Sequence, residues 1–270
     1  MSKENNSKIA KIIDSASTAV QQNIPQTIKE SDGVLSTVVG FFNNVVLYPV
    51  KKANLTFKYK LEKFREDLET KIAQIPQENL QVPPTMIAGP VMESLKYTYD
   101  EEELRDMYEN LLASAMDNRF ANKVHPSFVE TIKQMSPLDS IVLKAIVNSQ
   151  QLKCYNIVFT YEEISKKVYT YGMPDYFVEE LAALGDIFAV SSSIINLERL
   201  GLIVIRNGAI RGENYSLITE NQIYLSRLNH FNSLGKEIKP EFNNMTIEIN
   251  NYGQDFAKTC IKTEDKHNAD

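Results

Sequence analysis

The feature that most constrains the fold of this chain is a stripe of apolar side chains between residues 104 and 116. These side chains recur at spacings of three and four residues, which places them on one face of an α-helix. Asp100 is a candidate cap for this helix, and three glutamates follow it in the first turn, where the helix dipole favours acids. The stripe therefore predicts an amphipathic helix that buries one face, with its methionines as core residues. It consists of Leu104, Met107, Tyr108, Leu111, Leu112, Ala115 and Met116.

A second, longer helix is predicted over residues 50–75. Its apolar side chains follow a coiled-coil-like spacing from Val50 onwards, and opposite charges stand four residues apart on its outer face, as in Arg65 and Glu69. The seam covers only about three heptads, so packing within the chain and a free coiled coil both remain open. We therefore divide this part of the chain into an N-terminal helical region, 1–75, and a central helical block, 76–136.

An uncharged stretch, "GVLSTVVGFFNNVVLYPV" at residues 33–50, precedes the long helix. It falls just short of the roughly 20 residues that span a bilayer, and its asparagines are costly in lipid unless another helix pairs with them. Two interpretations stay open: a helix buried in a core or oligomer interface, and a segment that inserts or lies at a membrane beside anionic headgroups. The candidate membrane or oligomer residues are Val38, Phe41, Phe42, Asn43, Asn44, Val45, Lys51 and Lys52.

Residues 137–262 have the pattern of a winged-helix-like α+β module. Ser136 and Asp139 frame the start of a capped helix whose first residue is Pro137. A second helix is predicted to start near Thr160 and to run through "YEEISKKV". Helix, helix, helix, strand, strand and helix is the order of such a module.

The rest of this module contributes the β component. A third helix stops at Gly201 and leads into the strand "LIVIR", while "MTIEIN" at 245–250 alternates as a second strand before the closing helix "YGQDFAKTCI". Between the strands lies an insert, 207–244, with a helix of its own around "NQIYLSRLNHF", and a polar tail occupies 263–270. The predicted fold class is therefore mainly α, with a small β component in the last module.

Three pieces of the central block are distinctive: a double proline before "IAGP", the helix "EELRDMYENLLASAMD", and the segment "VHPSFVETIKQMSP". In these pieces, residues 78–144 closely resemble the abortive-infection alpha family, a bacterial domain family of unknown function linked to phage defence. The flanking segments "NNVVLYPVKKANL", "NLERLGLI" and "YGQDFAKTCI" extend the resemblance over most of residues 40–262. The resemblance implies abortive infection, meaning damage or arrest of the host cell once a phage is sensed, and it transfers no catalytic residue.

The sequence shows no motif for catalysis, for a metal or for a cofactor. The three histidines are far apart, no HExxH or paired CxxC occurs, and the glycines form neither GxGxxG nor GxxxxGK. Cys154 and Cys260 stand alone and are expected to be reduced thiols. We therefore predict no catalytic residues, no cofactor, no metal and no small-molecule substrate, with a dispersed enzyme site as the weaker alternative.

His125 invites a catalytic interpretation, but its neighbours favour a structural one. Pro126 suits the first position of a helix, and proline disfavours helical geometry at the residue before it. Phe128 then gives this helix its inward face. We interpret His125, Pro126 and Phe128 as a structural joint between the central block and the C-terminal module.

Charge argues against nucleic acid as the main partner. The chain has a net charge of −6, and residues 138–262 carry 12 Lys or Arg against 14 Asp or Glu, whereas DNA-binding surfaces gather cations. The candidate nucleic-acid contacts of this weaker interpretation are Arg199 on the third helix and Arg206 and Arg211 at the wing. Protein contacts are the favoured use of the module.

Together, these features predict a bacterial phage-defence component that acts through self-association or a protein partner, without chemistry of its own. No secretory signal is visible in the first thirty residues, so we expect a cytoplasmic protein, with peripheral attachment to the inner face of the cytoplasmic membrane as an option. A DNA-binding winged-helix transcriptional regulator is the alternative.

Overall fold

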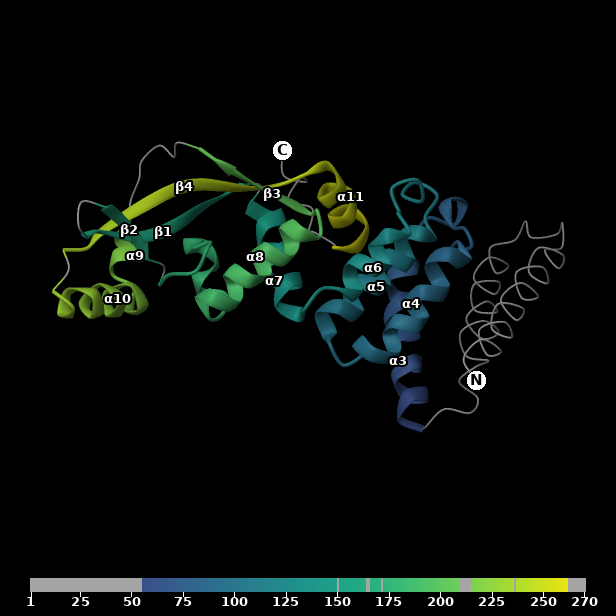
Figure 1. Ribbon diagram of the computed structural model, residues 1–270. Coiled ribbons are helices and arrows are strands. Elements are labelled where there is room, and N and C mark those ends of the chain that lie inside the picture. The colour runs from purple at the N-terminus through teal and green to yellow at the C-terminus, as the bar shows by residue number, and fades with distance from the viewer. Residues whose placement is uncertain are drawn as a thin grey trace, which may run out of the picture. The chain divides into compact units, whose positions relative to one another are not determined.

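The computed structural model describes residues 55–149, 151–163, 166–170, 172–208, 215–235 and 237–261. Within them the protein is mostly helical and contains a four-stranded antiparallel sheet (Figure 1). The chain forms two compact units, and the boundary between them falls between Lys133 and Gln134. The candidate segment at 33–50, its lysines Lys51 and Lys52, and the tail at 263–270 lie outside the described residues, so what was expected of them stays a prediction.

The described part of the first unit is built around α5. Its elements are α3 (Leu55–Ile72), η3 (Gln77–Asn79), α4 (Thr85–Thr98), α5 (Glu102–Ala115) and α6 (Ser127–Lys133). The helix α5 packs against α3, α4 and α6. Each side chain of the predicted apolar stripe is at most 3% exposed, which confirms the amphipathic helix and the core role of Met107 and Met116.

The long predicted helix is confirmed over α3, and its packing is internal to the chain. Phe64, Leu68 and Ile72 of the predicted seam are buried, and α3 packs against α5. Burial of this apolar seam against a neighbouring helix provides the main stabilisation that such a helix needs. On the outer face, Arg65 and Glu69 form the expected ion pair at 2.7 Å.

The predicted cap of α5 is wrong. The helix begins at Glu102, with Glu101 at the cap position and no side-chain cap hydrogen bond. Asp100 lies one residue too early to reach the first-turn N–H groups, and its carboxylate instead forms an ion pair with Lys60 of α3. A tertiary contact therefore replaces the local one.

The second unit combines helices with the sheet. Its elements are α7 (Pro137–Ser149), β1 (Gln151–Glu163), β2 (Lys166–Thr170), η4 (Glu179–Leu184), α8 (Ile187–Arg199), β3 (Ile203–Asn207), α9 (Ser216–Thr219), α10 (Gln222–Ser233), β4 (Lys239–Ile249) and α11 (Asn251–Cys260). The strand order is β2-β1-β4-β3. The predicted start of α7 is confirmed, because the Ser136 N–H donates to Asp139 Oδ2 (2.6 Å) and the Asp139 N–H donates to Ser136 Oγ (3.1 Å).

One strand, β1, serves two apolar clusters. Leu152 and Cys154 near its start are buried, and α7 packs against both β1 and β4. Farther along, alternate side chains of β1 enter a second cluster that also takes residues from α9 and α10. Because successive strand residues point to opposite faces, the two clusters use different sides of the same strand. The second cluster consists of Tyr155, Ile157, Phe159, Met173, Phe177, Ile218, Tyr224 and Ile238.

The predicted helix from Thr160 onwards is wrong. That stretch forms the end of β1 and most of β2, which pair so that Thr160 lies opposite Tyr169 and Glu162 opposite Lys167. The pairing brings opposite charges together across the strands, so the charged residues that suggested a helix stabilise a sheet instead. The strand β4 also begins at Lys239, inside the predicted insert 207–244, whereas β3, α10 and α11 are confirmed.

Candidate functional site

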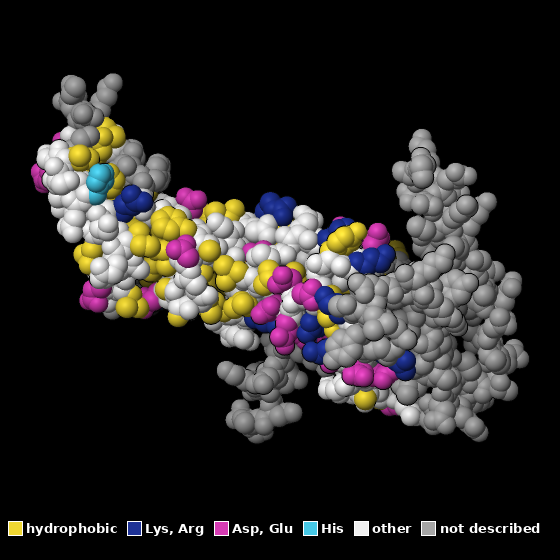
Figure 2. Space-filling model, turned by 90° about the horizontal axis from the view of Figure 1, so that it is seen from below, with side chains coloured by type: hydrophobic (Ala, Val, Ile, Leu, Met, Phe, Trp, Pro, Cys, Tyr) yellow, Lys and Arg dark blue, Asp and Glu magenta, His cyan; other side chains and the backbone are white. Residues whose placement is uncertain are grey.

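The helix α8 presents an exposed and uncharged face in the second unit. Its exposed side chains before Arg199 are Phe188, Ala189, Ser192 and Ile195, and Phe188 and Ile195 are 40% and 41% exposed. Phe188, Ser192 and Ile195 are spaced four and three residues apart and form one stripe, called the α8 face below. Figure 2, which views the protein from below, shows hydrophobic side chains gathered over this unit. Exposed apolar side chains that adjoin one another are typical of a protein-contact surface.

Residues at the two ends of α8 fix where the helix begins and ends. The Asp186 carboxylate caps α8, because Oδ1 accepts hydrogen bonds from the N–H groups of Phe188 (2.9 Å) and Ala189 (3.1 Å). Gly201, with a φ of 73°, ends the segment and confirms the predicted stop. The opposite side of α8 is buried in the unit and consists of Val190, Ile194 and Leu197.

Asn196 fastens α8 to the start of α7. Its Nδ2 donates to the carbonyl oxygen of Gln134 (3.1 Å) and to Asp139 Oδ2 (2.9 Å). Its Oδ1 accepts from Nε (3.0 Å) and an Nη (2.8 Å) of Arg199. Asp139 is buried and also closes the cap of α7, so a single carboxylate orients both helices. These hydrogen bonds therefore hold α8, and with it the α8 face, in a fixed position relative to α7.

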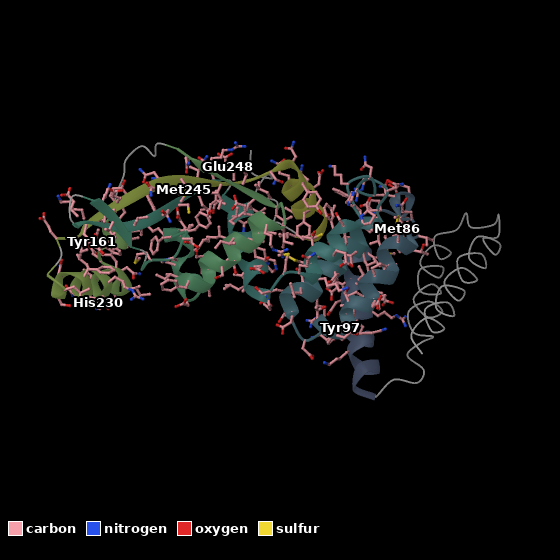
Figure 3. The ribbon with its side chains drawn as sticks, viewed as in Figure 1. Met86, Tyr97, Tyr161, His230, Met245 and Glu248 are labelled. Carbon is pink, nitrogen blue, oxygen red and sulfur yellow. The ribbon has the colours of Figure 1, made fainter. Side chains whose placement is uncertain are left out.

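The structure gives the arginines proposed for nucleic acid other contacts. Arg199 binds two amide side chains, those of Asn196 and Gln134, the latter at 3.1 Å from its other Nη. Arg206 lies on β3, with its Nε 3.5 Å from Oε2 of Glu248. Figure 3 labels Glu248 on β4. That carboxylate would repel a phosphate drawn to Arg206. Arg211 lies outside the described residues.

Two of the segments that carry the family resemblance meet behind α8. Asn250 Nδ2 donates to the carbonyl oxygen of Gly201 (2.8 Å), and Asn250 Oδ1 accepts from the N–H of Gly253 (2.9 Å). The approach is so close that a Cβ on Gly253 would lie 1.9 Å from the carbonyl oxygen of Leu202. "NLERLGLI" and "YGQDFAKTCI" thus form a packing junction, and the role they show is structural.

A cluster of ionisable side chains, partly buried and with Glu109 fully buried, lies between α3 and α5 of the first unit. Lys71 Nζ lies 2.5 Å from Asp106 Oδ1 and 2.8 Å from Asn110 Oδ1. Glu109 is 3% exposed, with Oε2 3.5 Å from Lys71 Nζ and Oε1 3.7 Å from Arg105 Nε. Glu109 Oε1 has no hydrogen-bond partner among the described residues. Sequence reasoning missed this cluster, since it forms only when α3 and α5 pack together.

The cluster contains a carboxyl group that changes charge near neutral pH. Burial raises the pKa of Glu109 to about 7, and the nearby carboxylates of Asp67 and Asp106 act in the same direction. The cations Lys71 and Arg105 oppose the rise in pKa without cancelling it. The arrangement can therefore hold a proton on Glu109 near neutral pH.

The three residues of the proposed joint come together at the start of α6. His125 is exposed, and its Nδ1 accepts the N–H of Ser127 (3.1 Å) and lies 2.6 Å from the Ser127 hydroxyl. Phe128 is buried, with its ring centroid 6.0 Å from that of His125, and Pro126 immediately precedes the helix. These contacts order the entry to α6, and the wider role as a joint stays a prediction.

Neither cysteine is placed for nucleophilic chemistry. Both are buried, and burial raises the pKa of the Cys154 thiol to about 12 and also raises that of Cys260, which disfavours the reactive thiolate. Over the described ranges, no group of three His, Cys, Asp or Glu side chains is arranged to hold a metal ion. In the same part of the chain, no helix has both the length and the apolar character needed to cross a membrane.

Comparison with known proteins gives one informative match. Residues 56–260 match the family described as abortive infection alpha. No protein of curated function matches the chain. One solved structure, an uncharacterized protein from the hydrocarbon-degrading marine bacterium Alcanivorax borkumensis SK2, is 11% identical with a TM-score of 0.30, and the alignment covers 54% of this chain and 96% of that one. Since the family match spans most of the sequence, including the three distinctive pieces of the central block, the protein belongs to the abortive infection alpha family.

Proposed function

We propose that this protein is a phage-defence component that acts through protein contacts made by the α8 face. Family membership supplies the link to abortive infection. The observation that carries the contact role is the make-up of the exposed side of α8, where Phe188, Ser192 and Ile195 stand without any charge before Arg199. Such a surface matches the apolar core of a protein interface better than it matches phosphates. No catalytic step belongs to the proposal.

The order of elements supports a winged-helix-like interpretation of the second unit. The helix α7, strand β1, helical turn η4, helix α8 and strands β3 and β4 occur in the order of such a module, with α8 in the place of the recognition helix. The strand β2 is inserted after β1, and α9 and α10 are inserted between β3 and β4. In a DNA-binding module that helix brings cations to the groove. Here Arg199 is hydrogen-bonded to uncharged amides within the unit, so the helix suits a protein surface instead.

A phage-challenge plating assay tests this function. Bacteria that express the wild-type chain are expected to resist a phage panel, and the double variant Phe188→Asp with Ile195→Asp is expected to lose that resistance. Burying two introduced carboxylates in an interface would weaken binding strongly, because each carboxylate would lose its hydration. The same charges are tolerated on a surface that makes no contact. Leu234→Asp is the matched control, because Leu234 is 56% exposed and lies away from α8, just after α10.

Two measurements test the DNA-binding alternative: duplex binding by the purified protein, and phage resistance in cells. We expect no salt-sensitive duplex binding, and we expect Arg206→Ala with Arg211→Ala to leave phage resistance unchanged. Equal resistance in the double aspartate variant and the wild type, with both folded by circular dichroism, would contradict the role of the α8 face. Membrane attachment through residues 33–50 is checked separately, by liposome flotation with and without that segment.

A further inference from the structure

We propose that the partner of the α8 face is a second copy of this chain, with the two α8 helices antiparallel and crossing at Ser192. This inference rests on the proposed function in so far as it takes the same face as the contact surface. It adds the identity of the partner and the direction of the pairing.

The spacing of the α8 face makes it complementary to itself. Phe188 and Ile195 lie four residues before and three residues after Ser192, on the same side of the helix. When two such helices run in opposite directions about a two-fold axis, Phe188 of one copy meets Ile195 of the other, and the reverse holds by symmetry. The small Ser192 at the crossing lets the backbones approach, while the larger side chains fill the space on either side.

Charge selects the antiparallel direction. Asp186 stands exposed at the start of α8 and Arg199 stands exposed at its end. An antiparallel pair places Arg199 of one copy, beside its half-exposed neighbour Glu198, near Asp186 of the other. A parallel pair instead sets Asp186 against Asp186 and Arg199 against Arg199. The positive charge of Arg199 is not neutralised within its own copy, because its two hydrogen-bonded partners, Asn196 and Gln134, are uncharged.

Another exposed apolar side chain precedes α8 in the chain. Leu184, at the end of η4 and two residues before Asp186, is 38% exposed. An apolar centre with charges at its edge is the usual composition of a dimer interface, and neither lipid headgroups nor nucleic acid would select an uncharged centre.

Cysteine cross-linking of the full chain tests the crossing point. In Ser192→Cys, the two introduced thiols are expected to meet and form an intermolecular disulfide on mild oxidation, because a disulfide needs a close approach of the two backbones. The native thiols of Cys154 and Cys260 are buried, so we expect them not to form intermolecular disulfides. Ser226→Cys is the matched control, since Ser226 is exposed on another helix, α10. Ser192→Cys is expected to cross-link at least about tenfold faster than the control, through effective concentration.

A mixed experiment tests the direction. Phe188→Cys alone and Ile195→Cys alone are expected to remain uncross-linked, and a mixture of the two is expected to yield the heterodisulfide. A parallel pair would instead cross-link each variant with itself, and that result would overturn the antiparallel arrangement. Sedimentation equilibrium should give a dimer for the wild type and a monomer for Phe188→Asp with Ile195→Asp.

The outcomes separate this inference from the proposed function. A wild-type chain that stays monomeric, with Ser192→Cys oxidising no faster than Ser226→Cys, overturns the self-pairing. If the double aspartate variant still loses phage resistance in that case, the proposed function stands and the partner is a different protein. Cross-linking at Ser192→Cys together with full resistance in the double aspartate variant supports the pairing and contradicts the proposed function.

Discussion

Glu109→Gln is expected to raise the free energy of unfolding at pH 8 by about 3 kcal/mol and to leave it nearly unchanged at pH 4. Glu109 is buried, and its pKa rises from 4.5 to about 7 in the folded chain. Below pH 4.5 the group is protonated whether the chain is folded or not. Between pH 4.5 and about 7 only the unfolded chain releases the proton, so the contribution of Glu109 to stability is lost as the pH rises.

Urea unfolding at the two pH values measures this effect. The glutamine keeps the shape of the side chain and removes the charge whose burial is unfavourable. Lys71 retains Asp106 and Asn110 as partners in the variant. Glu102→Gln is the control, because Glu102 lies on the same helix and is exposed, and it should show no such pH dependence. The same stability change at both pH values would show that the protonation of Glu109 does not matter.

Gly253→Ala is expected to destabilise the second unit by about 3 kcal/mol or more. The added Cβ would lie 1.9 Å from the carbonyl oxygen of Leu202 and 2.8 Å from Ile249 Cγ1, so backbone has to move. The movement also strains the Asn250 cap, which accepts the Gly253 N–H and donates to Gly201. Thermal and urea unfolding give the measurement.

Gly89→Ala is the matched control for this substitution. Gly89 lies inside α4, and a Cβ there meets nothing within 4 Å. Alanine is the better helix residue by roughly 0.5–1 kcal/mol, so this variant is expected to be neutral or slightly more stable. If both variants behave alike, the close approach at Gly253 is not what limits the substitution.

Local patterns predicted the parts of the fold that depend on local physics. The stripe on α5, the seam of α3, the cap at Ser136 and the stop at Gly201 all follow from periodicity or from one residue's conformational preference. These features need no knowledge of what packs against them. They are accordingly the features that the structure confirms in detail.

Predictions that required knowledge of distant partners were wrong or missing. The charged stretch from Thr160 has helical composition, but pairing with β2 and with β4, where Thr160 lies opposite Lys239, overrides that preference. Nothing in the sequence indicates that Glu109 is buried beside Lys71, because that contact forms only when α3 packs against α5. The α8 face could have been found from Phe188 and Ile195, which share one side of the helix, but only burial shows which side the unit leaves exposed.

Because of the strand order, the sheet of the second unit can be completed only late in synthesis of the chain. The strand β4 lies between β1 and β3, and Gln151 donates a hydrogen bond to Glu248 across 97 positions of the chain. During synthesis, β1 and β3 leave the ribosome well before the strand that joins them, and their edges stay open to other chains until then. Elements α3 to α6 pack against one another, with α3 and α4 both on α5 and α6 on α4 and α5, so the first unit can assemble while the rest is still being made. A message truncated ahead of Lys239 would thus yield a folded first unit attached to an aggregation-prone remainder.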